Sequence, residues 1–140
     1  MVKVILGAGN TTYSGWLSTQ ANELNLLRTE DFYRLFIEED SVDIFLAEHV
    51  FEHLTIEEGI VAAKNIYQFL KKGGHARIAV PDRYFNNKWY FNMCKPGGSG
   101  DARHPAYTHK VFYDYLSLSE VFVEAGFSVD LLEYCDEEGQ

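Results

Sequence analysis

The sequence predicts one α/β domain, residues 1–140, built around a mostly parallel, twisted sheet. Strand and helix signals alternate along the chain, and this order is typical of parallel strands joined by helices. The run 42–47 has the apolar character of a strand that is buried in such a sheet. The 140 residues, 46% of them hydrophobic, suffice for one packed core but not for two domains.

Two strands and a helix are expected in the N-terminal third. The apolar run 2–6 ends in a Gly-x-Gly turn at Gly7 and Gly9. Glycine tolerates a positive φ, and its missing side chain lets backbone N–H groups approach a ligand closely. A second short strand is expected over 15–20, and the spacing of apolar residues predicts a helix over 30–36.

The most strongly signalled helix begins after Thr55, because residues 55–58 read Thr-Ile-Glu-Glu, which is a Thr-x-x-Glu capping box. Apolar residues at helical spacing continue through the following three turns. Gly73 and Gly74 are expected to end this helix. The next strand is then predicted over 75–80.

The C-terminal third contains a second capping box, Ser-x-x-Glu at 117–120, and Gly126 suits the end of the helix that it opens. A last strand is predicted over 127–134. Residues 83–108 show no clear element, but their aromatic content argues against disorder. We expect this aromatic-rich insertion to shape a substrate pocket. The alternative is that its aromatic side chains cap the core or bury a subunit contact.

The composition disfavours several classes of protein. With 12 basic and 21 acidic residues, the formal net charge is -9, which disfavours nucleic acid and anionic membranes as partners. The N-terminus lacks the pattern of a secretion signal, and no apolar run reaches the roughly 18 residues of a membrane span. Cys94 and Cys135 form no Cys-x-x-Cys pair, so we expect free thiols in a cytoplasmic protein.

Polar and ionisable residues follow the carboxyl ends of the predicted strands. They lie at 7–10, at Gln20, at 48–53 and at Asp82. Open α/β sheets bind their ligands at this edge, so these residues predict a ligand cleft there.

Taken together, these segments resemble class I S-adenosylmethionine-dependent methyltransferases. The motifs that carry the resemblance are, in order, Leu-Gly-Ala-Gly-Asn at 6–10, Asp-Ile-Phe at 43–45, Glu-His-Val-Phe-Glu-His-Leu at 48–54, Phe-Leu-Lys-Lys-Gly-Gly at 69–74 and Ile-Ala-Val-Pro-Asp at 78–82. More narrowly, the chain is similar to a small bacterial group described as predicted S-adenosylmethionine-dependent methyltransferases. The resemblance covers nearly the whole chain and implies a three-layer, Rossmann-like sandwich.

The resemblance implies S-adenosylmethionine as the cofactor and assigns residues to it. The glycine-rich turn would lie under the methionine part, residues 25–26 would reach the adenine, and residues 48–49 would border the cofactor from the end of a central strand. The residues assigned in this way are Gly7, Ala8, Gly9, Asn10, Gln20, Asn25, Leu26, Glu48 and His49.

Gln20 departs from the family pattern, which places an acidic residue there to accept both ribose hydroxyls. A glutamine oxygen is a weaker acceptor than a carboxylate, because hydrogen bonds to a charged group are roughly twice as strong. We therefore expect reduced cofactor affinity, unless Glu23 replaces Gln20 in this role.

The family sheet also has a further antiparallel strand near its C-terminus, for which this chain has no counterpart. A sheet that lacks a strand exposes unpaired backbone groups at its edge. The sequence therefore predicts a fold truncated at the C-terminus, with an exposed sheet edge through which a homodimer can form.

Residues 49–53 also satisfy the His-x-x-Glu-His pattern of a group of zinc peptidases. That zinc site needs both histidines on one helical face. Here an apolar strand runs directly into the motif, and the capping box at Thr55 starts the helix only after His53. We therefore expect no metal at this pattern, and expect Glu52 and His53 to organise the strand-to-helix turn.

Methyl transfer is an in-line displacement at a sulfonium methyl, so the protein mainly aligns the reactants and excludes water. A general base is needed only for some acceptors. The candidates are His53, Asp82, His104 and His109, of which His53 and His109 are favoured because histidine titrates near neutral pH. A small-molecule acceptor is expected, while lipid, sugar and protein acceptors stay open.

Two other functions fit parts of the sequence. A nicotinamide-dependent oxidoreductase shares the first turn, but this chain lacks the third glycine of the Gly-x-Gly-x-x-Gly fingerprint and the acidic residue that binds ribose. A non-catalytic domain that keeps the methyltransferase shape for binding or assembly is the more serious alternative, because of Gln20 and the missing strand.

Overall fold

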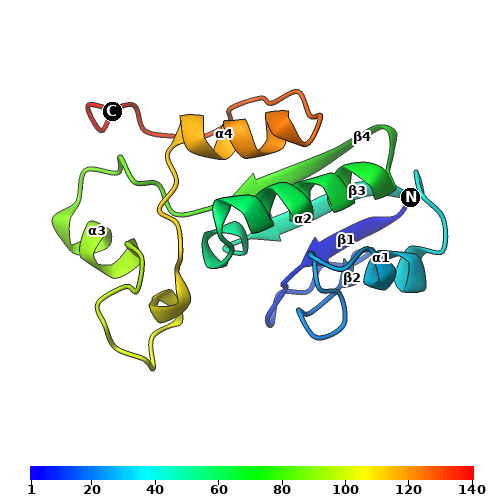
Figure 1. Ribbon diagram of the computed structural model, residues 1–140, viewed down its shortest axis with the longest axis horizontal. Helices are drawn as coiled ribbons and strands as arrows, with labels where there is room; N and C mark the ends of the chain where they lie inside the picture. The colour runs from blue at the N-terminus through cyan, green and yellow to red at the C-terminus, as the bar shows by residue number, and fades with distance from the viewer.

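A four-stranded, all-parallel sheet with the order β2-β1-β3-β4 forms the centre of the molecule in the computed structural model, which describes residues 1–140 (Figure 1). The strands are β1 (Lys3–Leu6), β2 (Leu17–Ser18), β3 (Val42–Glu48) and β4 (Leu70–Ala79). Every adjacent pair is parallel, so the carboxyl ends of all strands lie at one edge. The predicted α/β fold with a parallel sheet is confirmed.

The helices are α1 (Thr29–Phe36), α2 (Ile56–Phe69), α3 (Lys88–Cys94) and α4 (Tyr115–Glu124), with short 3-10 helices η1 (Phe51–His53) and η2 (Pro105–Thr108). The capping box predicted for α2 is present. The Thr55 hydroxyl accepts a hydrogen bond from the Glu58 N–H at 3.1 Å, and Glu58 Oε1 accepts one from the Thr55 N–H at 2.9 Å. This cap fixes where α2 begins and therefore fixes the turn that joins β3 to it.

One face of the sheet carries nearly the whole core. Alternate side chains of β1 and β3, such as Val4 and Phe45, pack there with buried side chains of α1, α2 and α4. The opposite face has a small cluster, in which Trp16 packs against Ile5, Ala8 and Leu46. The helices that pack on the sheet therefore lie on one face, because the connection from β1 to β2 contains no helix.

The end of α2 differs from the prediction. The helix ends at Phe69, and Gly73 and Gly74 lie inside β4, where the pairing with β3 is irregular. A Cβ on Gly74 would lie 2.8 Å from the backbone oxygen of Asp43. Glycine is thus required there because two backbones approach closely, and not because a helix ends.

The start of α4 also differs, because the helix begins one turn before the predicted cap. Asp114 is the N-cap, and its Oδ1 accepts from the Ser117 N–H at 2.8 Å, while Ser117 Oγ accepts from the Asp114 N–H at 3.0 Å. Gly126 follows the C-cap with φ +110°, as predicted for a residue after the helix end.

The strand predicted over 127–134 is wrong, since these residues form no strand. Phe127 packs instead against Tyr67 of α2 and Phe122 of α4, with ring centroids 5.1 Å and 5.6 Å away. Phe127, one of the apolar residues that suggested a strand, therefore packs on helices. No strand pairs with the outer side of β4, which is left as an edge of the sheet.

The segment 83–108 contains α3 and η2, which the sequence analysis missed. Phe85 packs against Tyr90, and both Tyr90 and Phe91 pack against Phe112, whose ring centroid lies 5.2 Å from that of Phe91. Figure 1 shows this segment as a lobe beside the carboxyl end of β4.

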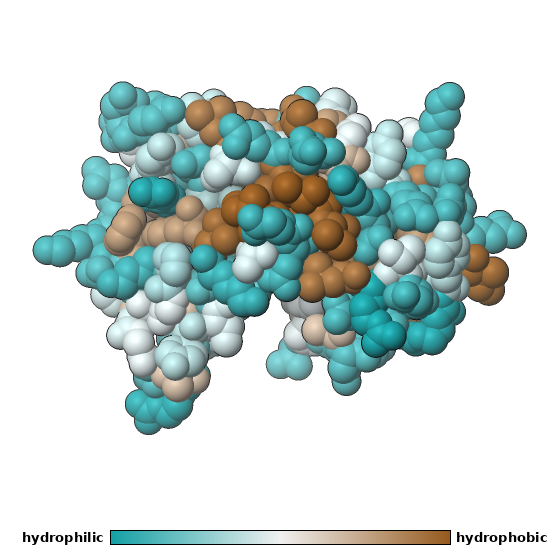
Figure 2. Space-filling view, in the orientation of Figure 1, coloured by the Kyte–Doolittle hydropathy of each residue, from teal (hydrophilic) through white to brown (hydrophobic).

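The helical face of the molecule, seen in Figure 2, carries a band of hydrophobic side chains over α2. Val61 and Tyr67 are among the exposed hydrophobic residues of that helix. None of the helices combines the length and the apolar character that crossing a bilayer requires.

Candidate functional site

The carboxyl ends of β1 and β3 lie side by side, since Leu6 is paired with Ala47. A small hollow opens at this edge, and Gly7, Ala8 and Glu48 are among the residues that line it. The structure therefore brings together the glycine-rich turn and the end of the central strand, as the sequence predicts for a ligand cleft.

The turn after β1 depends on two glycines in the left-handed region. Gly7 has φ +56° and Gly9 has φ +57°. A Cβ on Gly7 would lie 2.8 Å from Val50 Cγ2, whereas a Cβ on Gly9 would meet no atom within 4 Å. Gly7 thus allows close packing against the segment after β3, and Gly9 faces open space where a ligand can approach the backbone.

Gln20 is tied to this turn by two hydrogen bonds. Its Nε2 donates to the Gly9 carbonyl at 2.8 Å, and its Oε1 accepts from the Gly9 N–H at 3.1 Å. The residue that replaces the family's acidic group therefore braces the glycine-rich turn. The sequence did not indicate these two hydrogen bonds, because Gln20 was assigned to the ribose of the cofactor and not to the backbone of Gly9.

Asn25 and Leu26 make different contacts in the structure. Asn25 Oδ1 accepts from the Leu27 N–H at 3.0 Å, which closes a local turn. Leu26 is buried in the main core, and its carbonyl accepts from Asn65 Nδ2 at 2.8 Å. Leu26 therefore holds the loop to α2, and its contact with an adenine stays a prediction. Asn10 is exposed in the turn after Gly9.

His49 follows β3 directly and has an unusual backbone. Its φ is +58°, a left-handed value that is uncommon for a residue with a side chain, and its N–H donates to the Ala79 carbonyl of β4 at 2.9 Å. Residues held in this way tend to occur at functional sites. Glu48 and His49 are both exposed at the sheet edge.

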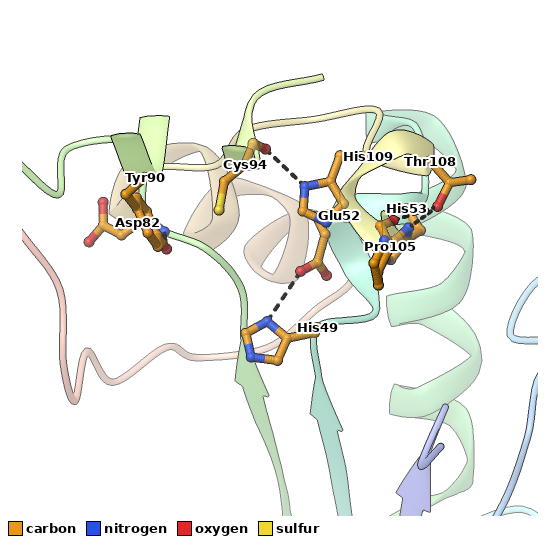
Figure 3. Close-up of polar contacts among 9 residues, drawn as sticks. All are labelled: His49, Glu52, His53, Asp82, Tyr90, Cys94, Pro105, Thr108 and His109. Atoms are coloured by element: carbon orange, nitrogen blue, oxygen red, sulfur yellow. Dashed lines mark hydrogen bonds and ion pairs between the residues drawn. The ribbon is translucent and has the colours of Figure 1, made fainter. Parts of the chain in front are cut away.

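Beyond His49, Glu52 lies at the centre of a cluster with three histidines (Figure 3). The Glu52 residue is 1% exposed, and neither carboxylate oxygen has a hydrogen-bond partner. His49 Nδ1 lies 3.4 Å from Glu52 Oε2, and its own side chain is 70% exposed. One ligand atom each of Glu52, His53 and His109 lies within 4.8 Å of the others.

Hydrogen bonds fix the tautomers of His53 and His109. His109 Nδ1 lies 2.9 Å from the Cys94 carbonyl, which can only accept, so Nδ1 carries the proton. His53 Nδ1 lies 2.8 Å from Thr108 Oγ1, and that hydroxyl donates to the Pro105 carbonyl at 3.1 Å. His53 Nδ1 therefore also donates, and the Nε2 lone pair of each ring is left for another partner.

The pKa of His53 is lowered, mainly because burial disfavours the charged ring. The nearby Glu52 carboxylate acts in the opposite direction but is the smaller cause. The charge of Glu52 also acts on Tyr113, whose hydroxyl is buried without a hydrogen-bond partner. Burial, with the charge of Glu52 as a smaller cause, raises the pKa of Tyr113 to about 12. Tyr113 therefore stays protonated over the ordinary pH range.

The backbone of Glu52 positions His109. The N–H groups of Lys110 and Val111 both point to the Glu52 carbonyl, at 2.7 Å and 3.3 Å. This contact joins segments that are far apart in the sequence and places His109 against His53, with ring centroids 4.8 Å apart. No local sequence signal reports such a pairing.

Asp82 has a different environment from the histidines. Its Oδ1 accepts from the Tyr84 N–H at 2.9 Å, and its Oδ2 accepts from the Cys135 N–H at 2.7 Å. Both oxygens therefore hold backbone segments together, which favours a positioning role over proton transfer. His104 likewise uses its Nδ1 to accept from the Ala106 N–H at 3.1 Å.

A groove of about 360 Å³ lies between α3 and the segment that follows His109. Its lining combines the cations Arg83, Lys95 and Lys110 with Phe91 and Phe112, and it includes no acidic residue. We call it the cationic groove. It differs in sign from the chain as a whole, whose formal net charge is -9.

Comparison with known proteins identifies a family. The model of a family described as a methyltransferase domain matches residues 8–78. This range includes the glycine-rich turn after Gly7, the segment 48–53 and most of β4. No curated protein and no solved structure matches the chain significantly.

Proposed function

Because the chain belongs to the methyltransferase domain family, we propose that it transfers the methyl group of S-adenosylmethionine to a small-molecule acceptor. The observation that carries this proposal is the glycine-rich turn at the carboxyl edge of the parallel sheet, where Gly7 and Ala8 line a small hollow with Glu48. The next glycine of the turn, Gly9, opens on free space. That edge is where open α/β sheets bind ligands.

We assign the residues of this edge to the proposed cofactor. The backbone of Gly7, Ala8 and Gly9, with Asn10 beside it, would contact the methionine part, and Gln20 holds this turn in shape. Gln20 Oε1 keeps a second lone pair that can accept a ribose hydroxyl. Glu48 and His49 would border the cofactor, and Asn25 and Leu26 its adenine. The cofactor supplies a methyl group on a positively charged sulfur.

The cationic groove supports an anionic acceptor. Its volume of about 360 Å³ is within the usual range for small-molecule sites. Arg83 and Lys95 would attract a carboxylate or phosphate, and Phe91 and Phe112 would cover an apolar part. Lys110 already forms an ion pair with Glu58, with Nζ 3.4 Å from Oε1. Alignment of such an acceptor with the methyl group is the main contribution that in-line transfer requires from the protein.

For an acceptor that loses a proton, His109 is the proposed proton acceptor, with His53 as the second. Each has its Nδ1 proton fixed by a hydrogen bond, so its Nε2 lone pair is available. His109 immediately precedes Lys110 of the cationic groove. The two free thiols support a cytoplasmic location in this proposal, because reducing compartments keep cysteines unpaired.

The test is production of S-adenosylhomocysteine from S-adenosylmethionine by the full chain, across a panel of small carboxylates and phosphates. Turnover with one acceptor, lost in Gly7→Arg and kept in the surface control Asp130→Asn, supports the proposal. Binding of S-adenosylhomocysteine without turnover on any acceptor supports the alternative, a non-catalytic methyltransferase-like domain. Absence of both turnover and binding overturns the cofactor assignment.

A further inference from the structure

We propose that Glu52, His53 and His109 form a binding site for one divalent transition-metal ion, with Zn²⁺ as the representative ion. The site would use one carboxylate oxygen of Glu52 and one ring nitrogen of each histidine. Because both Nδ1 atoms are engaged in hydrogen bonds, Nε2 is the ligand atom that each ring has left. Ion binding at this site can be tested without the cofactor and without an acceptor.

The first argument is the buried Glu52 carboxylate. Its residue is 1% exposed, and neither oxygen accepts a hydrogen bond. An unpaired buried carboxylate is costly, so buried charges in proteins are usually paired or coordinate a metal. His49, at 3.4 Å, is the one ion-pair partner within reach, and its exposed ring forms a pair only when it is protonated.

The second argument is the hydrogen bonding of the two histidines. Metal-binding histidines usually donate their other ring N–H to a carbonyl, carboxylate or water, which fixes the tautomer and the ring orientation. His109 donates from Nδ1 to the Cys94 carbonyl, and His53 donates from Nδ1 to the Thr108 hydroxyl. The hydrogen bonds that orient metal-binding histidines are therefore already present.

The three side chains are also close enough to share an ion. One carboxylate oxygen of Glu52 and one ring nitrogen each of His53 and His109 lie within 4.8 Å of one another. Zinc binds nitrogen and oxygen ligands at about 2.0 to 2.2 Å, so ligands around a tetrahedral ion are roughly 3.3 Å apart. Small rotations of half-exposed histidine side chains suffice to close the site. Three protein ligands leave a fourth position for water or a substrate.

This site differs from the zinc-peptidase pattern at 49–53. That pattern uses the two histidines of one helix as ligands and the glutamate as a base. Here Glu52 is a ligand, and His109 arrives from a distant segment through the bonds of Lys110 and Val111 to the Glu52 carbonyl. The requirement for two histidines on one helical face therefore does not apply.

Metal binding would change how an acceptor is activated. The ion uses the same Nε2 lone pairs that would otherwise accept a proton. In the loaded protein a bound ion, as a Lewis acid, would lower the pKa of an acceptor hydroxyl that coordinates to it.

The test is a titration of the full chain, without a histidine tag and after treatment with a chelator, with Co²⁺ alone. The visible d–d absorption reports the ligand field, and added Zn²⁺ displaces the Co²⁺. We expect one bound ion per chain, and a loss of affinity of at least about tenfold in His53→Gln, His109→Gln and Glu52→Gln. The control is His75→Gln, an exposed histidine in the middle of β4, where it is paired with Ile44 of β3.

Zn²⁺ should also raise the melting temperature of the wild-type chain, because an ion that binds the folded state alone stabilises it. The two histidine variants, whose positions are half-exposed, should lose this shift while keeping the wild-type circular dichroism spectrum. Absence of Co²⁺ binding by the wild-type chain overturns the proposal, and so does an equal loss in the His75→Gln control. Neither outcome bears on S-adenosylmethionine, which is absent from the titration.

Discussion

Gln20 and Gly9 form a pair of hydrogen bonds in which the side-chain amide both donates to and accepts from one backbone residue. The amide thus closes the turn after β1 from the end of β2. An aspartate or glutamate cannot make both bonds, because a carboxylate only accepts. The departure from the acidic residue of related proteins therefore has a structural consequence in this chain.

We predict that Gln20→Ala weakens the binding of S-adenosylhomocysteine by about tenfold, since losing two hydrogen bonds of about 1 kcal/mol each loosens the turn. Isothermal titration calorimetry measures the change. Gln68→Ala is the matched control, because it removes an amide that bonds Tyr33 and Glu39 away from the turn. Equal affinities of Gln20→Ala and wild type would show that the brace does not serve the ligand.

The two glycines of the turn should respond differently to alanine. Both substitutions place a side chain at positive φ, which costs about 1 to 2 kcal/mol. Gly7→Ala also forces its Cβ to within 2.8 Å of Val50, while Gly9→Ala meets nothing within 4 Å. Urea denaturation should therefore give a larger loss of unfolding free energy for Gly7→Ala, and equal losses would contradict the packing described here.

Acid should weaken the link between β1 and β3 at Asp43. The hydrogen bond from the Val2 N–H, at 2.7 Å, and more weakly Lys71, lower the pKa of Asp43 below its usual 3.8. The folded state thus binds fewer protons than the unfolded state, so this stabilisation is complete above about pH 4 and is lost as the pH falls through the lowered value.

We therefore expect Asp43→Asn to lower the melting temperature at neutral pH and to flatten its decrease below about pH 4. The control is Asp130→Asn, which changes an exposed carboxylate without a hydrogen bond. An Asp43→Asn protein that keeps the full acid dependence would show that Asp43 does not cause it.

The free edge of β4 predicts association of two copies. β4 lies at the end of the strand order, so its outer backbone groups have no partner strand. Sedimentation equilibrium should give a mass of twice 16.0 kDa at high protein concentration. A mass of 16.0 kDa at every concentration would exclude pairing through this edge.

Short sequence motifs correctly predicted the elements whose ends are fixed by hydrogen bonds between neighbouring residues. The capping box at Thr55 placed the start of α2 correctly, because both of its hydrogen bonds join residues within one turn. The start of α4 was missed because Asp114 and Ser117 are both good N-caps, and the structure uses Asp114. Gly74 was wrongly assigned to a helix end. Glycine is required at this position because the backbone approaches Asp43 of the neighbouring strand, and a contact between strands has no local sequence signal.

The sequence predicted the part of the candidate site that depends on the order of the strands. The sheet order brings the turn at Gly7 beside Glu48, and the ends of parallel strands are predictable once the strands are known. The contact of His109 with Glu52 depends on backbone hydrogen bonds between distant segments, so no periodicity or spacing in the sequence indicates it.

The most direct test of the central claim is a calorimetric titration of the full chain with S-adenosylhomocysteine, with NAD as the control ligand. We expect binding of S-adenosylhomocysteine in about the micromolar range, no binding of NAD, and loss of binding in Gly7→Arg. No heat of binding at about millimolar S-adenosylhomocysteine, or equal binding of NAD, would contradict the proposed cofactor.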